Sequence, residues 1–509
     1  MIRHFRLSFH WIIPVALAFS LGAVYAATLA PGLSWVNNGA DGGDFISAVA
    51  TGGVPHPTGY PTYLLLTGVL RNLPMGSLAL RMNLFSAVCM LSAVLLVYAA
   101  VVRFLSSRRL NWLAGASAAL AFGLSPLVWS QAVITEVYGL QTLFVALIVY
   151  LWSYGITLKP DRLIYYDITT GLLAGLALGN HLTSLFLLPL VFSMGGAFTN
   201  ENPETARGFK NGLFGWKVNW VALARRFGAF LAGLLVYLAL PLRAMTRPPV
   251  NWGDPVTLKN FLALVSGRLY SGLVFTLPWN DLLPRLQYWA HLLSDQFGWL
   301  GLAVLIYGLL FNHTENIKNI FPGLAWLFII YSVFSIGYNS YDSDVYLIPA
   351  FLAASIWLGL GALELVEWAS RRARRLSIIM GCVVLIGLIV PAVFHYPQVD
   401  ASHDNRAADF GQAVFRSAPA GAIIFTEGDQ ATFALRYFQY VLHQRADVTL
   451  VVADLMPYDW YRTGLAYTYP ALHVPGQAGT DWSGVLIQAN PGRPVCLVSY
   501  LQAAEISCH

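Results

Sequence analysis

The chain has 509 residues, of which 57% are hydrophobic and only 11% are charged, with a formal net charge of +5. Soluble globular proteins carry roughly 25% charged residues, so this composition excludes a soluble globular enzyme. The positive charge lies in short loops rather than in a basic and aromatic patch, so we expect no nucleic-acid partner.

The apolar runs predict about eleven membrane-spanning helices, and hence a mainly α, polytopic transmembrane helical bundle. The first run follows a charged start, as in a signal peptide, but its length and the later spans favour a retained first helix. The expected spans cover residues 11–29, 81–103, 111–128, 133–153, 164–180, 182–195, 223–243, 296–312, 319–337, 345–366 and 376–395.

Arginine and lysine clusters lie in alternate loops, and this predicts the orientation of the chain. With a cytoplasmic N-terminus and eleven spans, every cluster falls on the cytoplasmic side, as the positive-inside rule requires. The clusters contain Arg3, Arg6, Arg103, Arg108, Arg109, Lys159, Arg162, Arg207, Lys210, Lys217, Arg225, Arg226, Lys318, Arg371, Arg372, Arg374 and Arg375.

The opposite face receives a long first loop at about 30–80, a second loop at about 244–295 and the short segment 337–346. We therefore expect two parts, a transmembrane domain over 1–395 and a soluble extracytoplasmic α/β domain over 396–509.

Within the second part, residue patterns predict helices and strands in alternation. The helices are expected at 403–416 and 429–442, and the strands at 421–426, 447–452 and 494–500. Cys496 and Cys508 lie there, and they could pair if this region faces an oxidising compartment.

Two aspartates lie three residues apart in the first outer loop. If the segment Asp41-Gly42-Gly43-Asp44-Phe45 is helical, both carboxylates share one face. A carboxylate shielded at the membrane boundary has a raised pKa and can act as a general base. Two close carboxylates could also hold a divalent cation, although we do not expect a metal or cofactor to be required. The alternative is a solvated acidic turn.

The sequence HPTGYP at 56–61 forces a fixed, non-helical path, because it contains two prolines and a glycine. Such a turn would hold His56 and Tyr60 in place. His56 could bind a phosphate or orient a carboxylate, and the alternative is an exposed loop histidine.

Other polar residues are predicted close to the outer ends of spans. Glu136 lies near the fourth span, Asn180 and His181 lie between the fifth and sixth, and Asp342 and Asp344 form a third outer acidic pair. Polar groups at membrane depth are costly unless they face a cavity or a partner, so we expect one outward cavity. Helix caps or interhelical contacts are the alternative.

The second outer loop begins at an interfacial arginine. The guanidinium of Arg243 suits a phosphate or a carboxylate, although it could instead anchor its helix at the interface. Asn251, Trp252 and Asp254 offer a stacking ring with flanking polar groups, which is typical of sugar sites. A tryptophan of the interfacial belt is the competing interpretation.

Several of these segments together resemble the signature of the protein O-mannosyltransferase-like membrane family, in the C-type glycosyltransferase superfamily. They are DGGDFI at 41–46, HPTGYP at 56–61, NLFSA at 83–87, TEVYGLQTLF at 135–144, GLALGNHLT at 175–183, and PLRA with PPVNWGDP between 241 and 255. The resemblance covers roughly residues 11–350. The chain has Asp44 where the family usually has glutamate, and Thr58 where it usually has proline.

The resemblance implies a membrane glycosyltransferase that moves a sugar such as mannose from a polyprenyl-phosphate carrier to an acceptor hydroxyl on the outer face. The acceptor would be protein Ser/Thr, with glycan or lipid left open. Asp41 would be the catalytic base, and Asp44 would orient the acceptor or exchange roles with it. His56 and Arg243 would hold the lipid phosphate, and Trp252 would contact sugar or acceptor.

Two other functions are consistent with a polytopic membrane protein. A transporter or flippase of lipid-linked sugar favours charges near the bilayer midplane and inverted repeats, and the sequence shows neither. A non-catalytic envelope assembly protein predicts that the acidic loop tolerates change. In each case the chain contacts membrane lipids, and we expect it in the plasma (inner) membrane of a prokaryote.

Overall fold

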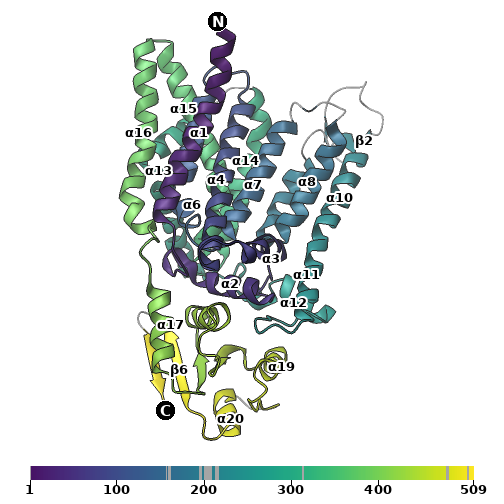
Figure 1. Cartoon of the computed structure of the whole chain (residues 1–509). Coiled ribbons are helices and arrows are strands. Elements are labelled where there is room, and N and C mark those ends of the chain that lie inside the picture. The colour runs from purple at the N-terminus through teal and green to yellow at the C-terminus, as the bar shows by residue number, and fades with distance from the viewer. Residues whose placement is uncertain are drawn as a thin grey trace.

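The computed structural model describes residues 2–155, 158, 162–193, 198–199, 209–211, 217–311, 315–476, 481–500 and 504–509. Figure 1 shows a bundle of helices with the N-terminus at one end and a smaller domain, which holds the C-terminus, at the other. Lys159 and Arg207 of the predicted basic clusters lie outside the described residues.

Within the described residues, eight helices are long and apolar enough to cross a bilayer. They are α1 (Ile2–Thr28), α4 (Leu78–Phe104), α7 (Tyr138–Gly155), α10 to α11 (Trp220–Ala244), α13 (Trp279–Leu310), α14 (Glu315–Gly337), η8 to α15 (Ser343–Ser370) and α16 (Arg374–Val399). Shorter helices occupy the remaining predicted positions, namely α5 (Asn111–Gly123), α8 (Leu163–Leu178) and η4 with α9 (Leu182–Ser193). The predicted multi-span helical fold is therefore confirmed.

One boundary differs clearly from the prediction. Helix α13 has 32 residues and begins at Trp279, whereas the sequence predicted a loop up to about 295. Its first half contains Asn280, Asp281 and Arg285, so this half is more polar than a typical membrane span. The helix changes direction at Gly298, whose φ is 64° and ψ is 167°.

The first and second outer loops lie between the bundle and the C-terminal domain. Figure 1 shows α2 (Gly42–Thr51), α3 (Pro61–Gly68) and α12 (Leu258–Val265) in this layer. The loops are joined by a short backbone bridge, in which Val54 N donates to Val250 O at 2.9 Å. A Cβ at the preceding Gly53 would lie 2.2 Å from that same oxygen, so the close approach requires a glycine there.

The C-terminal domain is built on a mixed four-stranded sheet of order β5-β4-β6-β7. Strands β4 (Ile423–Thr426), β5 (Thr449–Val452) and β6 (Val495–Tyr500) are parallel, and β7 (Ala504–Cys508) is antiparallel to β6. Its helices are α17 (Arg406–Ser417), α18 (Asp429–Arg436), α19 (Asp459–Thr468) and α20 (Trp482–Ala489). The three predicted strands are present, whereas α19, α20 and β7 were not predicted.

The C-terminal domain shares a hydrophobic core with the first outer loop. Phe45 and Ile46 of α2 belong to the same buried cluster as Phe433 of α18. The connecting segment is also fixed, because Asp404 Oδ2 accepts hydrogen bonds from Trp35 N at 2.7 Å and from Val36 N at 3.0 Å. The domain is therefore anchored to the loop that carries Asp41 and Asp44.

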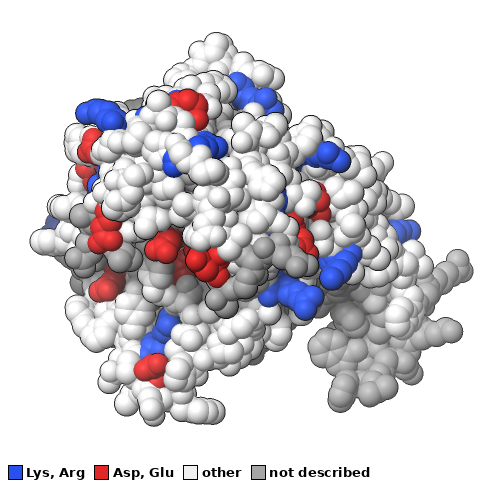
Figure 2. All heavy atoms as spheres, turned by 90° about the horizontal axis from the view of Figure 1, so that it is seen from below, with Lys and Arg blue, Asp and Glu red and all other residues white. Residues whose placement is uncertain are grey.

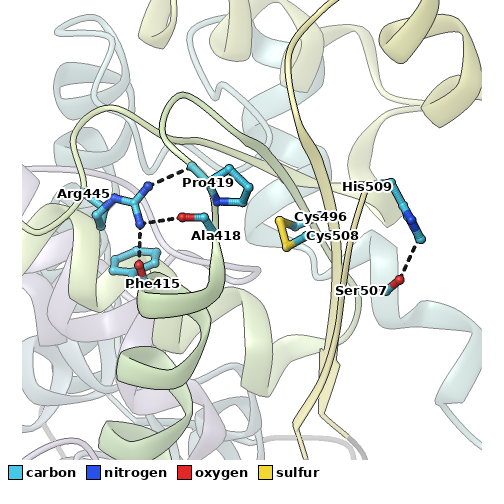
Figure 3. The surroundings of a disulfide bond; sticks show 8 residues. All are labelled: Phe415, Ala418, Pro419, Arg445, Cys496, Ser507, Cys508 and His509. Carbon is cyan, nitrogen blue, oxygen red and sulfur yellow. Dashed lines mark hydrogen bonds between the residues drawn. A yellow bond between two sulfur atoms is a disulfide. The ribbon is translucent and has the colours of Figure 1, made fainter.

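Cys496 and Cys508 form a disulfide that joins β6 to β7. Figure 3 shows Arg445 nearby, where its guanidinium donates to the carbonyls of Ala418 and Pro419, each at 2.9 Å. The pairing that the sequence left open is thus present, and it lies at the outer edge of the sheet.

The two ends of the bundle carry different groups. The basic clusters flank the ends of α1, α4, α15 and α16 that lie away from the C-terminal domain (Figure 1), and Arg108 there binds Glu364 at 3.0 Å. Figure 2 views the opposite face, where acidic and basic side chains are interspersed in a mostly uncharged surface.

Candidate active site

The imidazole of His56 lies between the two aspartates of the first outer loop. Its Nδ1 lies 2.9 Å from Asp44 Oδ2, and its Nε2 lies 3.4 Å from Asp41 Oδ2. Asp41 ends the 3-10 helix η1 (Val36–Asp41), and Asp44 lies in the first turn of α2. A helical segment therefore presents both carboxylates to the rigid turn that holds the histidine.

The carboxylate of Asp44 is fully enclosed and has a donor on each side. Oδ2 also accepts from the backbone N of His56 at 2.8 Å, and Oδ1 accepts from Trp252 Nε1 at 3.2 Å and from Arg436 NH1 at 3.3 Å. Burial raises the pKa of Asp44, but His56 and the Arg436 charge outweigh it, so the pKa lies below its ordinary value. Asp44 is thus an ionised anchor for the imidazole.

Asp41 differs from Asp44 because its side chain is 40% exposed. Desolvation by the surrounding protein raises the pKa of Asp41 to about 6; the charge of His56 opposes this rise, and the charges of Asp429 and Asp44 add to it. A partly accessible carboxylate with a pKa close to the working pH is suited to accept a proton.

His56 itself is only 4% exposed. Burial lowers its pKa, but the charges of Asp41 and Asp44 prevail and raise the pKa to about 9. Near neutral pH the imidazole is therefore protonated, and both of its nitrogens donate. The hydroxyl of Tyr60 lies 3.3 Å from Nε2 and donates to Pro57 O at 3.2 Å.

Three more predicted residues surround this centre. The ring of His181 lies 6.3 Å from that of Tyr60, and burial with the His56 charge lowers the pKa of His181 to about 4. Glu136 is 3% exposed, and burial with the Asp41 charge raises the pKa of its carboxyl well above the ordinary value. The charge of Asp342 contributes to the raised pKa of Asp41.

Other predicted residues have partners elsewhere. Arg243 donates to the carbonyls of Gly53 at 3.2 Å and Leu64 at 3.4 Å, so its guanidinium ties the end of α11 to the first outer loop. Asn180 is fully buried and donates to Val137 O at 3.2 Å. Neither side chain contacts Asp41 or His56.

The remaining predicted residues shape neighbouring structure. Asn251 Nδ2 donates to Asp254 Oδ1 at 3.0 Å, which closes the turn that carries Trp252. Asp344 Oδ2 accepts from the Tyr288 hydroxyl at 3.1 Å, and this aspartate lines a separate polar cavity of about 250 Å³.

The sequence did not reveal three residues of α18 that reach the centre. The ring of Phe433 stacks on that of His56 with centroids 6.0 Å apart and an interplanar angle of 18°. Arg436 binds Asp44 although 392 residues separate them, and Asp429 raises the pKa of Asp41. The one available signal was a cation, Arg436, inside the apolar stretch ATFALRYF.

The centre carries its own positive charge in His56 and Arg436. Among the residues that the structure describes, no group of at least three His, Cys, Asp or Glu side chains is arranged to hold a metal ion. That a divalent cation is dispensable stays a prediction.

Comparison with known proteins finds similarity to one family in two regions of the chain. The profile of the protein O-mannosyl-transferase TMEM260 N-terminal domain matches residues 41–202, and that of TMEM260-associated domain 2 matches residues 407–478. Over these two regions the chain is similar to the TMEM260 protein O-mannosyl-transferase family. The two matched regions contain Asp41, His56 and Arg436, so they meet at the centre described above.

Full-length members of this family agree with that similarity. Protein O-mannosyl-transferase TMEM260 of Mus musculus is 28% identical over 523 residues, which cover 93% of this chain and 67% of the relative. Protein O-mannosyl-transferase tmem260 of Dictyostelium discoideum is 22% identical, over 91% of this chain and 60% of the relative. The chain thus spans about two thirds or less of the length of these TMEM260 proteins.

A solved structure shows which fold this is. ArnT from Cupriavidus metallidurans, bound to undecaprenyl phosphate, superposes with a TM-score of 0.57 at 13% identity, covering 96% of this chain and 92% of ArnT. The TMEM260-like chain therefore has the C-type glycosyltransferase fold, and the predicted enzyme class, an O-mannosyltransferase-like glycosyltransferase, is confirmed.

Proposed function

We propose that the chain transfers a sugar, mannose by analogy with its family, from a polyprenyl-phosphate carrier to a Ser/Thr hydroxyl of a protein on the outer face. The observation that carries this proposal is the partly exposed Asp41 carboxylate beside the buried imidazolium of His56. The centre lies between the bundle and a soluble domain, where a lipid-borne donor and a water-borne acceptor can meet.

The nature of the donor and acceptor is supported by the relatives. The ArnT structure contains undecaprenyl phosphate, and the TMEM260 relatives are named protein O-mannosyl-transferases. A glycan or lipid acceptor is the other possibility that the assay below separates. Transport of lipid-linked sugar has no comparable support, because the proposed reacting groups, Asp41, Asp44 and His56, lie together at the end of the bundle beside the C-terminal domain.

The reaction is a single displacement in which Asp41 is the base. The Asp41 carboxylate takes the proton of the acceptor hydroxyl as its oxygen forms a bond to the anomeric carbon. The bond between that carbon and the phosphate oxygen breaks, and the polyprenyl phosphate leaves with the electron pair. The protonated His56 holds Asp41 in place and stabilises negative charge developing nearby.

The other predicted residues surround this reaction. Glu136, His181, Tyr60 and Asp342 lie around the centre and would contact the sugar or acceptor. Arg243, Asn180, Asn251, Asp254 and Asp344 would act through the loops that they hold, whereas the indole of Trp252 reaches Asp44 directly.

We also propose that the protein lies in the plasma membrane of a prokaryote, with a cytoplasmic N-terminus and an extracytoplasmic C-terminal domain. A membrane-impermeant thiol reagent applied to intact cells tests this orientation in a Cys382→Ser background. Asn72→Cys, on the side of the C-terminal domain, should react, and Ser106→Cys, at the other end of α4, should not. The reverse pattern would contradict the orientation.

The transfer itself is tested with purified protein in lipid nanodiscs. Polyprenyl-phosphate mannose and a Ser/Thr-rich peptide are supplied, and mass spectrometry follows released polyprenyl phosphate and hexose on the peptide. Parallel reactions replace the peptide by an oligosaccharide or a lipid acceptor, or the donor by a nucleotide sugar. Transfer from the nucleotide sugar, or none from the lipid donor to any acceptor, would overturn the proposal.

A further inference from the structure

The C-terminal domain touches the reaction centre directly through α18. A Cβ added at Gly43 of α2 would lie 2.6 Å from the carbonyl oxygen of Phe433, so the two helices approach as closely as a glycine permits. The Phe433 ring covers one face of His56, with an interplanar angle of 18°. The docking of α18 therefore closes the centre on the side that faces away from the membrane.

Arg436, at the end of the same helix, completes the surroundings of Asp44. Its side chain is 8% exposed, that of Asp44 is 0% exposed, and the guanidinium NH1 lies 3.3 Å from Asp44 Oδ1. The guanidinium also lies over the Trp252 ring, 5.7 Å from its centroid. A buried carboxylate is destabilising unless charged and hydrogen-bonding partners surround it, and Arg436 is such a partner.

The contact between Arg436 and Asp44 helps to balance the negative charge of the centre. Acidic groups that face the centre come from several elements, and they are Asp41, Asp44, Glu136, Asp342 and Asp429. His56 supplies one compensating charge from the first loop, and Arg436 supplies another from the C-terminal domain. Without Arg436, the Asp44 carboxylate would take up a proton more readily and would bind the imidazole less tightly.

We propose that Arg436 is a positioning residue, which holds the Asp44 carboxylate against His56 so that the C-terminal domain completes the reaction centre. This inference rests on the proposed transferase function. Arg436 acts through Asp44 and His56, and it is not assigned a contact with substrate. A simple structural ion pair is the competing explanation, and the two explanations differ in their effects on kcat and on pH dependence.

Kinetics of matched arginine variants test the proposal. Arg436→Met should lower kcat about 10- to 100-fold with little change in KM, because it misplaces a catalytic group. The acidic limb of its pH profile should move to higher pH, and Arg436→Lys should restore kcat to within a few-fold. The control is Arg445→Met, since Arg445 binds Asp447 inside the domain. Arg445 also donates to backbone carbonyls there, as Figure 3 shows. Arg445→Met should lower the stability of the protein without moving the acidic limb of the pH profile.

A double-variant cycle separates this inference from the proposed function. If Arg436 acts through Asp44, then Asp44→Asn combined with Arg436→Met should lower kcat no further than Asp44→Asn alone. The same cycle can be measured without substrate on the midpoints of thermal unfolding. There the double variant should lower the midpoint by less than the sum of the decreases in the two single variants.

The possible outcomes are distinct. A wild-type protein without transferase activity would refute the proposed function, while the melting cycle would still decide whether the two residues are coupled. The wild type could be active while Arg436→Met shows the same kcat and the same acidic limb of the pH profile as Arg445→Met. That result would overturn the positioning role. Additive losses in both cycles would overturn it as well.

Discussion

The Nδ1 atom of His56 lies 2.9 Å from Asp44 Oδ2, and both side chains are buried, although 12 residues separate them in the chain. This pair fixes the imidazole so that its other nitrogen faces the more exposed Asp41. The two aspartates consequently have different environments, and we assign them different roles. In the proposed mechanism Asp44 is the anchor and Asp41 is the base.

The pH dependence of transfer should follow this pair of environments. The pKa of Asp41 is raised to about 6, so activity should fall as the pH drops through 6 and the base becomes protonated. The pKa of His56 is raised to about 9, so activity should fall again above pH 9 as the cation is lost. A profile of kcat/KM against pH measures apparent values for the coupled group. A rate unchanged between pH 5 and 7 would contradict the assignment.

Replacing His56 by glutamine should separate its charge from its hydrogen bonds. His56→Gln should lower kcat about 10- to 100-fold, because a cation next to the developing negative charge is lost. The His56 charge lowers the pKa of Asp41, so its removal should shift the acidic limb to higher pH. His403→Gln, at an exposed position, serves as the control. Equal kinetics in both variants would argue against a catalytic cation at His56.

The glycine at position 43 should be needed for docking of the C-terminal domain. In Gly43→Ala the new methyl group meets the backbone oxygen of Phe433 at 2.6 Å, so α18 must move. We expect a loss of about 1–3 kcal/mol in unfolding free energy, as for other overpacked sites. Activity should fall at least about 10-fold, because displaced catalytic groups lose effective geometry.

Gly464 provides a matched control for that substitution. It lies in α19, and an added Cβ there has no heavy atom within 4 Å. Gly464→Ala should keep full activity and gain about 0.5–1 kcal/mol, as alanine replaces glycine in a helix. Thermal unfolding and transfer assays report both effects. If Gly43→Ala behaves like its control, α18 does not dock as described.

The disulfide should contribute to stability and not to chemistry. Cys496 and Cys508 close a loop with a sequence separation of 12. Their replacement by serine should lower the unfolding free energy of the C-terminal domain by about 2–3 kcal/mol, since the unfolded chain gains freedom. The rate per folded molecule should stay unchanged. Thiol titration should find two free cysteines, Cys89 and Cys382, in the wild type and no more.

The parts of this structure that the sequence revealed are those encoded by local patterns. Long apolar runs marked the helices, and a rigid Pro- and Gly-containing turn marked the position of His56. The start of α13 at Trp279 was missed because its first half is polar, although it continues an apolar helix. An apolar pattern reports contact with lipid, and this part of the helix extends beyond the expected span.

Contacts between segments that are distant in the chain could not be predicted from the sequence. Arg436 meets Asp44 across 392 residues, and no local pattern encodes that meeting. Conversely, Arg243 was expected at a phosphate, yet its guanidinium holds the carbonyls of Gly53 and Leu64. A residue type indicates what a side chain can bind, whereas its partner depends on how the loops pack.

The most direct test of the whole account is single-turnover transfer by Asp41→Asn. Asparagine keeps the shape and polarity of the side chain but cannot act as the base. We expect polyprenyl phosphate release to slow about 10²- to 10⁴-fold, with an unchanged melting temperature. Asp281→Asn, at an exposed position in the first turn of α13, should react at the wild-type rate. Release by Asp41→Asn within a few-fold of wild type would contradict the central claim that Asp41 is the base.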